Sequence, residues 1–350
     1  MNPLVIQWSS RILFVGVAAV SIPATAHHSS SEYDESQVVE VQGEVVEVFW
    51  RNPHVVVKVA TEENGQEAVW ELEGSSVSGL RRRGLSSDVL AVGDHVRVAG
   101  FPSTQQPQHM SLNHLMLPTG EELVIRYASG PRWTDREAFA SGDRIFDPAT
   151  VVAARKDAHG IFRVWTWGRE EPGWWFFSDA DRFPLTEAAL AGLKGYNEVE
   201  DNPVRKCIAP GMPATMGNPY PLTFVQVDPN TIEIREEEFD RVRTIHLNAG
   251  SMADVEPSPL GYSVGHWEDD NTLVIKTNKI NAEYFNRVGV KQSEAVEVDE
   301  RFEVSEDGSR LDYNLVVTDP ATLTEPWAWH AHWVWVPGEE VGRYECTVAQ

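Results

Sequence analysis

The second half of this chain is a succession of short segments that favour β-strands, with turn-forming residues between them. Thr223 to Val227 and Thr231 to Arg235 have the β-branched and aromatic content of strands. Asp228-Pro229-Asn230 separates them, as Asp269-Asp270-Asn271 and Glu306-Asp307-Gly308 separate later pairs. Eight or more such strands in a row predict a closed or nearly closed antiparallel barrel, because closure hides edges that would otherwise pair with other molecules.

A smaller set of predicted strands precedes this region. The segment from Val38 to Val48 alternates apolar and polar residues, and Asn52-Pro53 turns the chain into the next strand. The expected elements are strands at 38–48, 54–59, 67–72, 95–99 and 110–117 and a helix at 76–90. Three strands, a helix and two strands is the order of a five-stranded barrel of the oligonucleotide/oligosaccharide-binding (OB) type.

The chain begins with an apolar run from Ile12 that follows Arg11 and ends in Ala24-Thr25-Ala26. This is the pattern of a secretory signal peptide, and the run is shorter than the roughly 20 residues that cross a bilayer. We predict cleavage after Ala26 and a location in the periplasm or outside the cell. No later segment approaches that length, so the processed chain is expected to have no integral membrane segment.

These observations divide the chain into a signal peptide (1–26), an OB-like barrel (27–125), a linker rich in Pro, Gly and charged residues (126–150) and a larger barrel (151–350). In the first strand expected for the larger barrel, Gly160 precedes Trp165, and this arrangement resembles the lipocalins. The predicted fold class is therefore all-β, with a lipocalin-like barrel after the OB-type one.

The charge of the chain restricts its partners. The sequence has 29 Lys and Arg against 53 Asp and Glu, a formal net charge of −24. Such a surface repels phosphate backbones, so nucleic acid is excluded as an expected partner even though the small barrel has a nucleic-acid-type fold.

The chain has two cysteines, Cys207 and Cys346. In an oxidising compartment an isolated pair most simply forms one disulfide, which here ties the C-terminus to the body of the second domain. The alternative is two unpaired thiols with a redox role.

Cleavage after Ala26 would create an N-terminus at His27, with His28 beside it. An N-terminal histidine chelates Cu(II) through its amine and ring nitrogen, and a further imidazole would complete the set that copper favours. His54, which the Asn52-Pro53 turn directs, is the candidate for that ligand. The three histidines therefore predict a site for copper or another transition metal. The alternative is that His27 and His28 belong to a disordered terminus.

A second candidate site lies on the expected strand from residue 327 to 335. Side chains two apart on a strand share a face, so His330 and His332 lie on one face. The other face carries Trp327, Trp329, Trp333 and Trp335. Imidazoles facing a barrel lumen could bind a metal or serve as acid and base. Tryptophans facing it would instead form an aromatic wall for an apolar or sugar ligand, with solvated histidines.

A metal held by His330 and His332 needs a third ligand, for which His246 and His266 on other strands are the candidates; His246 is also a candidate acid or base, and His266 a candidate ligand-binding residue. The alternative is an aromatic stripe that only packs against a helix or the other domain. Thirteen tryptophans in the chain favour a ligand cavity.

Three charged runs are interpreted as structural. Arg81-Arg82-Arg83 is typical of a solvated helix end rather than a binding patch, and Glu236-Glu237-Glu238 is typical of a solubilising loop. Glu268-Asp269-Asp270 falls at a predicted turn, where acids are usually solvated. The sequence lacks the phosphate-loop, dinucleotide-binding and His-Glu-x-x-His motifs, which removes the commonest nucleotide and zinc-protease classes.

Ala26-His27-His28-Ser29 and Asn52-Pro53-His54 resemble the opening of an uncharacterised family of secreted bacterial proteins, a domain of unknown function. The second half resembles a companion domain of hypothetical secreted proteins, through segments such as Cys207 to Pro213, Gly261 to Glu268 and Glu345-Cys346. This similarity implies two domains and paired cysteines, and it implies no activity.

We therefore expect an exported two-domain β protein that binds a small, largely apolar ligand in its larger barrel, with a copper-type site at the processed N-terminus as a further hypothesis. The alternative function is a periplasmic lyase, isomerase or hydrolase that acts on a small hydrophobic substrate, with His330, His332 or His246 as acid and base. A third alternative is a structural envelope protein, expected if neither barrel has a cavity.

Overall fold

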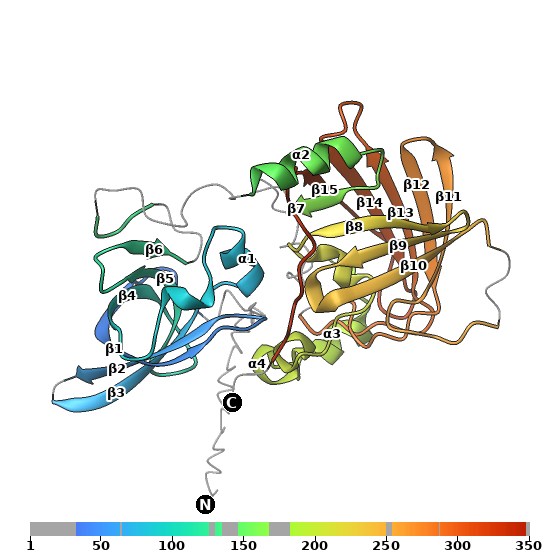
Figure 1. The fold of residues 1–350 in the computed structure, drawn as a ribbon. Helices are drawn as coiled ribbons and strands as arrows, with labels where there is room; N and C mark the ends of the chain where they lie inside the picture. The colour runs from blue at the N-terminus through green and yellow to red at the C-terminus, as the bar shows by residue number, and fades with distance from the viewer. Residues whose placement is uncertain are drawn as a thin grey trace, which may run out of the picture.

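The computed structural model describes residues 33–63, 65–125, 130–134, 146–167, 183–249, 254–286 and 288–347. These residues form two β-barrels, a small one from the first part of the chain and a large one from the rest (Figure 1). The predicted signal peptide lies outside the described residues.

The small barrel confirms the OB-type prediction. Its strands are β1 (Val39–Phe49), β2 (Val56–Glu63), β3 (Gln66–Glu73), β4 (His95–Pro102), β5 (His109–Met116) and β6 (Glu122–Val124). They pair in the order β3-β2-β1-β4-β5-β6, and a parallel pairing of β3 with β5 closes the first five strands into a ring. Helix α1 (Val77–Arg81) and the 3-10 turn η2 (Ser87–Val89) lie between β3 and β4, where the helix was expected.

Two glycines allow the strands of this barrel to approach closely. A Cβ atom on Gly43 would lie 2.0 Å from the carbonyl oxygen of Ala60, and one on Gly100 would lie 1.8 Å from that of Ser111. Register shifts occur near both positions, at Val45/Glu47 in β1 and immediately before Gly100 in β4. Irregular, sharply curved strands are what a barrel of only five strands requires.

The large barrel has nine strands: β7 (Val164–Trp167), β8 (Leu222–Asp228), β9 (Thr231–Glu236), β10 (Arg241–Leu247), β11 (Tyr262–Asp269), β12 (Thr272–Asn278), β13 (Glu297–Val304), β14 (Arg310–Thr318) and β15 (Trp327–Trp335). They close in the order β10-β11-β12-β13-β14-β15-β7-β8-β9. The prediction of a larger, closed barrel is confirmed.

One pairing in this ring is parallel, that of β10 with β11, and the others are antiparallel. A closed ring with an odd number of strands cannot alternate in direction throughout, so at least one neighbouring pair must run the same way. The expectation of a purely antiparallel, lipocalin-like barrel is corrected in this respect.

The two ends of the large barrel differ. The hairpin turns β8–β9, β11–β12 and β13–β14 lie at one end, and helices α3 (Glu187–Leu193) and α4 (Glu198–Asp201) lie at the other (Figure 1). The same half of the chain contains α2 (Pro148–Asp157), η5 (Pro203–Lys206), η6 (Ala214–Gly217) and η7 (Glu238–Asp240). The four residues of η6 are all buried, and two of them, Thr215 and Met216, contact the inward side chains of Glu236 and Arg243 at the end where β10 begins.

Part of the predicted linker is fastened to the small barrel. The carboxylate of Glu122, which is buried at the start of β6, accepts hydrogen bonds from the backbone N–H groups of Arg132, Trp133 and Thr134. Burial raises the pKa of Glu122, but these donors and His114 outweigh it, so the pKa is lowered overall.

The C-terminal segment returns from the large barrel to the small one (Figure 1). The backbone N–H of Thr347 donates to the carbonyl of Asn52 at 3.1 Å, and Asn52 and Cys346 form a parallel bridge. Among the described residues, no helix is long and apolar enough to cross a bilayer.

Candidate functional site

The orientation of β15 decides between the two sequence hypotheses for this strand. Trp327, Trp329 and Trp333 are buried in the core of the large barrel, whereas His330 is exposed and His332 is half-buried. The tryptophans therefore face the lumen and the imidazoles face outward. The hypothesis of a lumenal acid, base or metal site on His330 and His332 is wrong for this reason.

The other two candidate histidines are also on the outer surface. His246 lies on β10 and stacks on Tyr262, with ring centroids 4.5 Å apart, and His266 is exposed on β11. In the order of the barrel, β7, β8 and β9 separate β10 from β15. The structure thus does not bring His246 or His266 to His330 and His332, and His266 does not line the lumen.

The lumenal tryptophans belong to a larger aromatic cluster. The ring centroid of Trp333 lies 5.3 Å from that of Trp167 on β7 and 5.1 Å from that of Tyr313 on β14. The same cluster includes Trp329, Phe302 and Trp165, and Trp335 packs against it while remaining partly exposed. Trp333 is 1% exposed, and its indole N–H has no hydrogen-bond acceptor among the described residues.

A belt of buried polar side chains adjoins these rings in the lumen and shares Tyr313 with them. It consists of one inward side chain from each of five consecutive strands: Arg243 (β10), Ser263 (β11), Thr277 (β12), Glu300 (β13) and Tyr313 (β14). The Arg243 guanidinium pairs with both carboxylate oxygens of Glu300, and its Nε donates to Ser263 at 3.0 Å. Tyr313 donates its hydroxyl to Glu300 at 2.9 Å.

The charges and hydrogen bonds of the polar belt stabilise one another. Burial lowers the pKa of Arg243, but the charge and hydrogen bonds of Glu300 outweigh it and the pKa is raised overall. Burial and the same carboxylate raise the pKa of Tyr313 well above its ordinary value. Tyr313 is therefore a neutral donor and Arg243 a paired cation, which is how a charge pair is retained in an apolar interior.

Next to the polar belt, Glu236 and Arg241 face each other across β9 and β10. Glu236 accepts from the Thr215 hydroxyl through one oxygen, while its Oε1 is buried with no hydrogen-bond partner among the described residues, as is Nη1 of Arg241. Burial raises the pKa of Glu236 to about 7 and lowers that of Arg241.

These buried polar residues were not predicted from the sequence. The alternation of inward and outward side chains along each strand could have indicated them. Arg243 shares a face with Ile245 and Leu247, and Glu300 shares one with Val298 and Phe302. A charged residue in register with an apolar face is expected to be buried and paired.

The interpretation of two charged runs is corrected by the contact between the barrels. Glu236, Glu237 and Glu238 are all buried rather than solubilising. Glu237, with a fully buried side chain, lies 3.3 Å from Arg81 and 3.5 Å from Arg82 of the small barrel. The run Arg81-Arg82-Arg83 is therefore not a solvated helix end, because its first two residues bind the other barrel.

Arg83 completes the correction of the arginine run. It donates to the backbone carbonyls of Val124 at 3.2 Å and Ile125 at 2.8 Å within the small barrel. In contrast, Glu268, Asp269 and Asp270 are exposed at the end of β11 and in the turn that follows it, as predicted.

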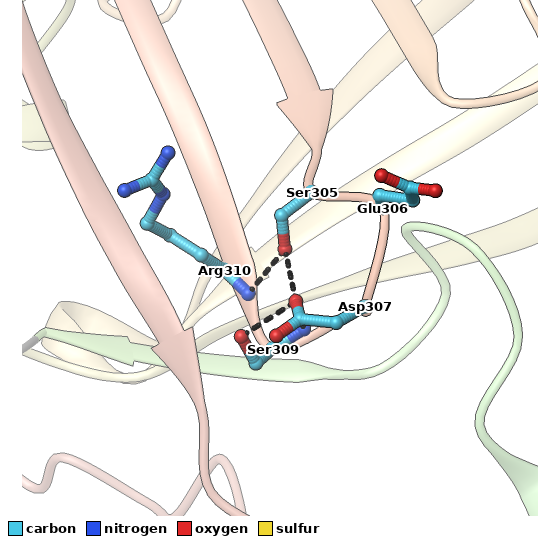
Figure 2. Close-up of a pocket in the computed structure, with 5 residues that line it drawn as sticks. All are labelled: Ser305, Glu306, Asp307, Ser309 and Arg310. Carbon is cyan, nitrogen blue, oxygen red and sulfur yellow. Dashed lines mark hydrogen bonds between the residues drawn. The ribbon is translucent and has the colours of Figure 1, made fainter.

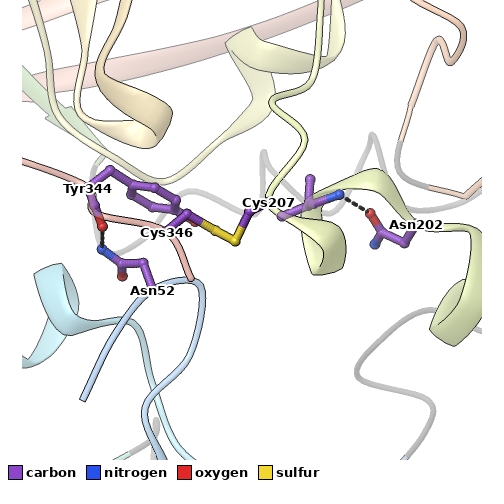
Figure 3. The surroundings of a disulfide bond; sticks show 6 residues. Asn52, Asn202, Cys207, Tyr344 and Cys346 are labelled. Atoms are coloured by element: carbon purple, nitrogen blue, oxygen red, sulfur yellow. Dashed lines mark hydrogen bonds between the residues drawn. A yellow bond between two sulfur atoms is a disulfide. The ribbon is translucent and has the colours of Figure 1, made fainter. Parts of the chain in front are cut away.

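The disulfide prediction is confirmed: Cys207 and Cys346 are bonded. Figure 3 shows Asn52 of the small barrel beside this bond, with its side-chain amide donating to the carbonyl of Tyr344. The disulfide therefore fixes the C-terminal segment to the half of the chain that forms the large barrel, and the hydrogen bonds of Asn52 hold the same segment against the small barrel.

The proposed metal ligands are only partly within the described residues. His27 and His28 lie outside them. His54 Nδ1 lies 2.7 Å from Glu73 Oε1, and the His54 side chain is 35% exposed. Within the part of the chain that the structure describes, no group of three or more His, Cys, Asp or Glu side chains is gathered to hold a metal ion.

A depression of about 630 Å³ lies at the hairpin end of the large barrel, along Ser305, Glu306, Asp307, Ser309 and Arg310 (Figure 2). Asp307 there accepts from the Ser305 and Ser309 hydroxyls, and these bonds with the Ser309 N–H lower its pKa to about 2. Asp307 and the two serines of this depression bond to one another as a turn, and so we do not place the site there.

No curated protein matches this sequence. The first part of the chain matches one family model, and this match agrees with the similarity of the opening residues to a domain of unknown function. Residues 15–111, which include most of the small barrel, match the model of DUF6152, a family of unknown function.

Proposed function

We propose that the large barrel is a binding module for a small, largely apolar molecule held among the lumenal tryptophans. The single observation that carries the proposal is the Trp333 indole N–H, buried in the lumen without an acceptor among the described residues. A buried donor of this kind normally has a partner, which a bound molecule or water would supply. A barrel of nine strands is also wide enough to hold one small ligand.

The composition of the lumen supports an apolar ligand with a limited polar contribution. Aromatic rings from β7, β13, β14 and β15 form one side, and the polar belt forms a short polar zone beside them. Sites for small molecules are built in this way, with mostly apolar walls and a few placed polar groups.

The proposal is tested with N-phenyl-1-naphthylamine, a neutral apolar fluorophore. We expect one molecule to bind per chain, with enhanced probe emission and quenched tryptophan emission. Ala331 faces the lumen between Trp329 and Trp333, whereas Ala328 faces outward on the same strand. Ala331→Leu should therefore weaken binding on the order of tenfold, and the matched control Ala328→Leu should not.

Absence of binding, or equal effects of the two substitutions, would refute the proposal. Near-UV circular dichroism of both variants establishes that the barrel is folded in each. A catalytic role for His330, His332 or His246 on a lumenal substrate is not part of the proposal, because their imidazoles lie on the outer surface.

A transition-metal site at the processed N-terminus is a second candidate, favoured by the contact of His54 with Glu73. A carboxylate that binds one ring nitrogen fixes the tautomer and leaves Nε2 as the ligand atom. Tyr33, the first described residue, is connected to the same strand as Glu73. It contacts His109, and His109 pairs with Glu71, which lies two residues before Glu73 on β3. His28 lies five residues before Tyr33, and five extended residues span at most about 17 Å.

This second candidate includes export, since it requires cleavage after Ala26. N-terminal sequencing of the protein secreted by its host should begin at His27. Titration of that protein with Cu(II) should give one tight site that His54→Ala weakens and His95→Ala, an exposed histidine of the same barrel, does not.

A further inference from the structure

Glu236 and Arg241 face each other on neighbouring strands of the large barrel. If this barrel has the proposed function, the pair indicates which chemical group its ligand contains. Both side chains project from the inward faces of β9 and β10, and the two residues are direct neighbours in the ladder. Each presents one buried polar atom without a hydrogen-bond partner among the described residues, an acceptor on Glu236 and a donor on Arg241. Glu236 is 6% exposed.

The polar neighbours of this pair are engaged elsewhere. Arg243 is bound to Glu300, Ser263 and Thr277, and Thr215 donates to the other oxygen of Glu236. The remaining acceptor and donor therefore call for a group that both donates and accepts. A hydroxyl is the smallest organic group that does so.

We propose that Glu236 and Arg241 form the polar end of the ligand site and bind the hydroxyl group of an uncharged, otherwise apolar alcohol. The hydroxyl oxygen accepts a hydrogen bond from Nη1 of Arg241, and the hydroxyl O–H donates a hydrogen bond to Oε1 of Glu236. A carboxylate ligand fits less well, because it has no proton to donate to Glu236 and approaches a protein with a net charge of −24.

The charged and titratable groups that act on Glu236 are Arg241 and Arg243 from β10, Glu238 from η7 and Tyr313 from β14. Because the pKa of Glu236 is about 7, the carboxylate that accepts the hydroxyl is the minor form at pH 6 and the major form at pH 8. Binding of an alcohol should therefore strengthen over this range, and binding of a ligand without a hydroxyl should not.

The test compares undecan-1-ol with 1-methoxydecane, which have equal numbers of heavy atoms, as competitors of N-phenyl-1-naphthylamine for the full chain. The ether accepts but does not donate. We expect the alcohol to bind on the order of tenfold more tightly than the ether at pH 8 and to lose most of this preference at pH 6.

The variant Glu236→Met/Arg241→Met removes both members together, so that no single charge is left buried. It should bind the ether and the alcohol equally. Glu233→Met/Arg235→Met is the matched control, because these residues form an ion pair of 2.8 Å on the same strand but outside the lumen. The control should keep the preference for the alcohol.

Equal binding of alcohol and ether by the unmodified protein, which is the result if only water occupies the pair, would overturn the inference. So would a preference that the double variant retains or that does not change with pH. Failure of the proposed function gives a different result, namely that the naphthylamine probe itself does not bind.

Discussion

Arg81 of the small barrel donates a hydrogen bond to the fully buried carboxylate of Glu237 in the large barrel, at 3.3 Å. The same oxygen, Oε2, accepts the backbone N–H of Gly342 at 2.9 Å, so one carboxylate joins both barrels and the C-terminal segment. The disulfide between Cys207 and Cys346 lies a few residues further along that segment. The contact between the barrels therefore combines an ionic, a backbone and a covalent link.

Glu237→Ala should lower the free energy of unfolding by about 3 kcal/mol, because it leaves the largely buried Arg82 without its counter-charge. Glu233→Ala is the control, since Glu233 forms an ion pair with the exposed Arg235 and should change stability by less than about 1 kcal/mol. Urea denaturation of both variants measures the difference. Equal effects would show that the contact between the barrels contributes little.

Removal of the disulfide should destabilise the protein because the bond closes a loop with a sequence separation of 139. The chain-entropy model gives about 4 to 5 kcal/mol for a loop of this length. The comparison is between the unmodified protein and Cys207→Ser/Cys346→Ser in urea, without reductant. Addition of dithiothreitol should lower the midpoint of the unmodified protein and leave that of the variant unchanged; a shift in the variant would point to another cause.

Arg243→Met should cost about 3 to 5 kcal/mol, because the Glu300 carboxyl group would be left in the barrel interior without its partner. Arg243→Met/Glu300→Met removes both charges and should be more stable than the single variant. Differential scanning calorimetry measures the two. A double variant that is no more stable than the single one would mean that Ser263, Thr277 and Tyr313 depend on the pair for their own hydrogen bonds.

The stability of the protein should depend on pH through Glu236. Its folded-state pKa of about 7 lies above the ordinary value of 4.5, so the folded state binds more protons than the unfolded state between these values. Stability should therefore fall by about 3 kcal/mol as the pH rises from 4.5 to 7, and this contribution should be level above pH 7. Glu236→Gln should remove this slope in urea midpoints measured from pH 4.5 to 8. An unchanged slope would assign the effect to other groups.

The elements of the fold were largely predictable because the local patterns are strong. The alternation of Val38 to Val48 and the turn residues Asp228-Pro229-Asn230 specify strands and hairpins without knowledge of what they pack against. The order of elements then identified the small barrel, and two isolated cysteines identified the disulfide. The nine-strand count and the parallel pairing of β10 with β11 were not predictable, since they depend on how the ring closes.

The charged runs were misinterpreted because exposure was inferred from residue type. Glu237 and Arg81 are far apart in the sequence, and each is unremarkable without the other. The alternation of side chains along β10 and β13 would have indicated that Arg243 and Glu300 are buried. It could not show that the two side chains pair, because two other strands, β11 and β12, lie between β10 and β13 in the barrel.

The sequence by itself determined that the histidines and tryptophans of residues 327 to 335 lie on opposite faces, because the period of a strand is two. Only the tertiary structure decided that the tryptophan face is the inner one, since barrel closure buries one face of every strand and the local pattern is the same for either choice. The same closure brought Arg243, Glu300, Glu236 and Arg241 together. Contacts of this kind depend on the register of the whole ring, which no single segment contains.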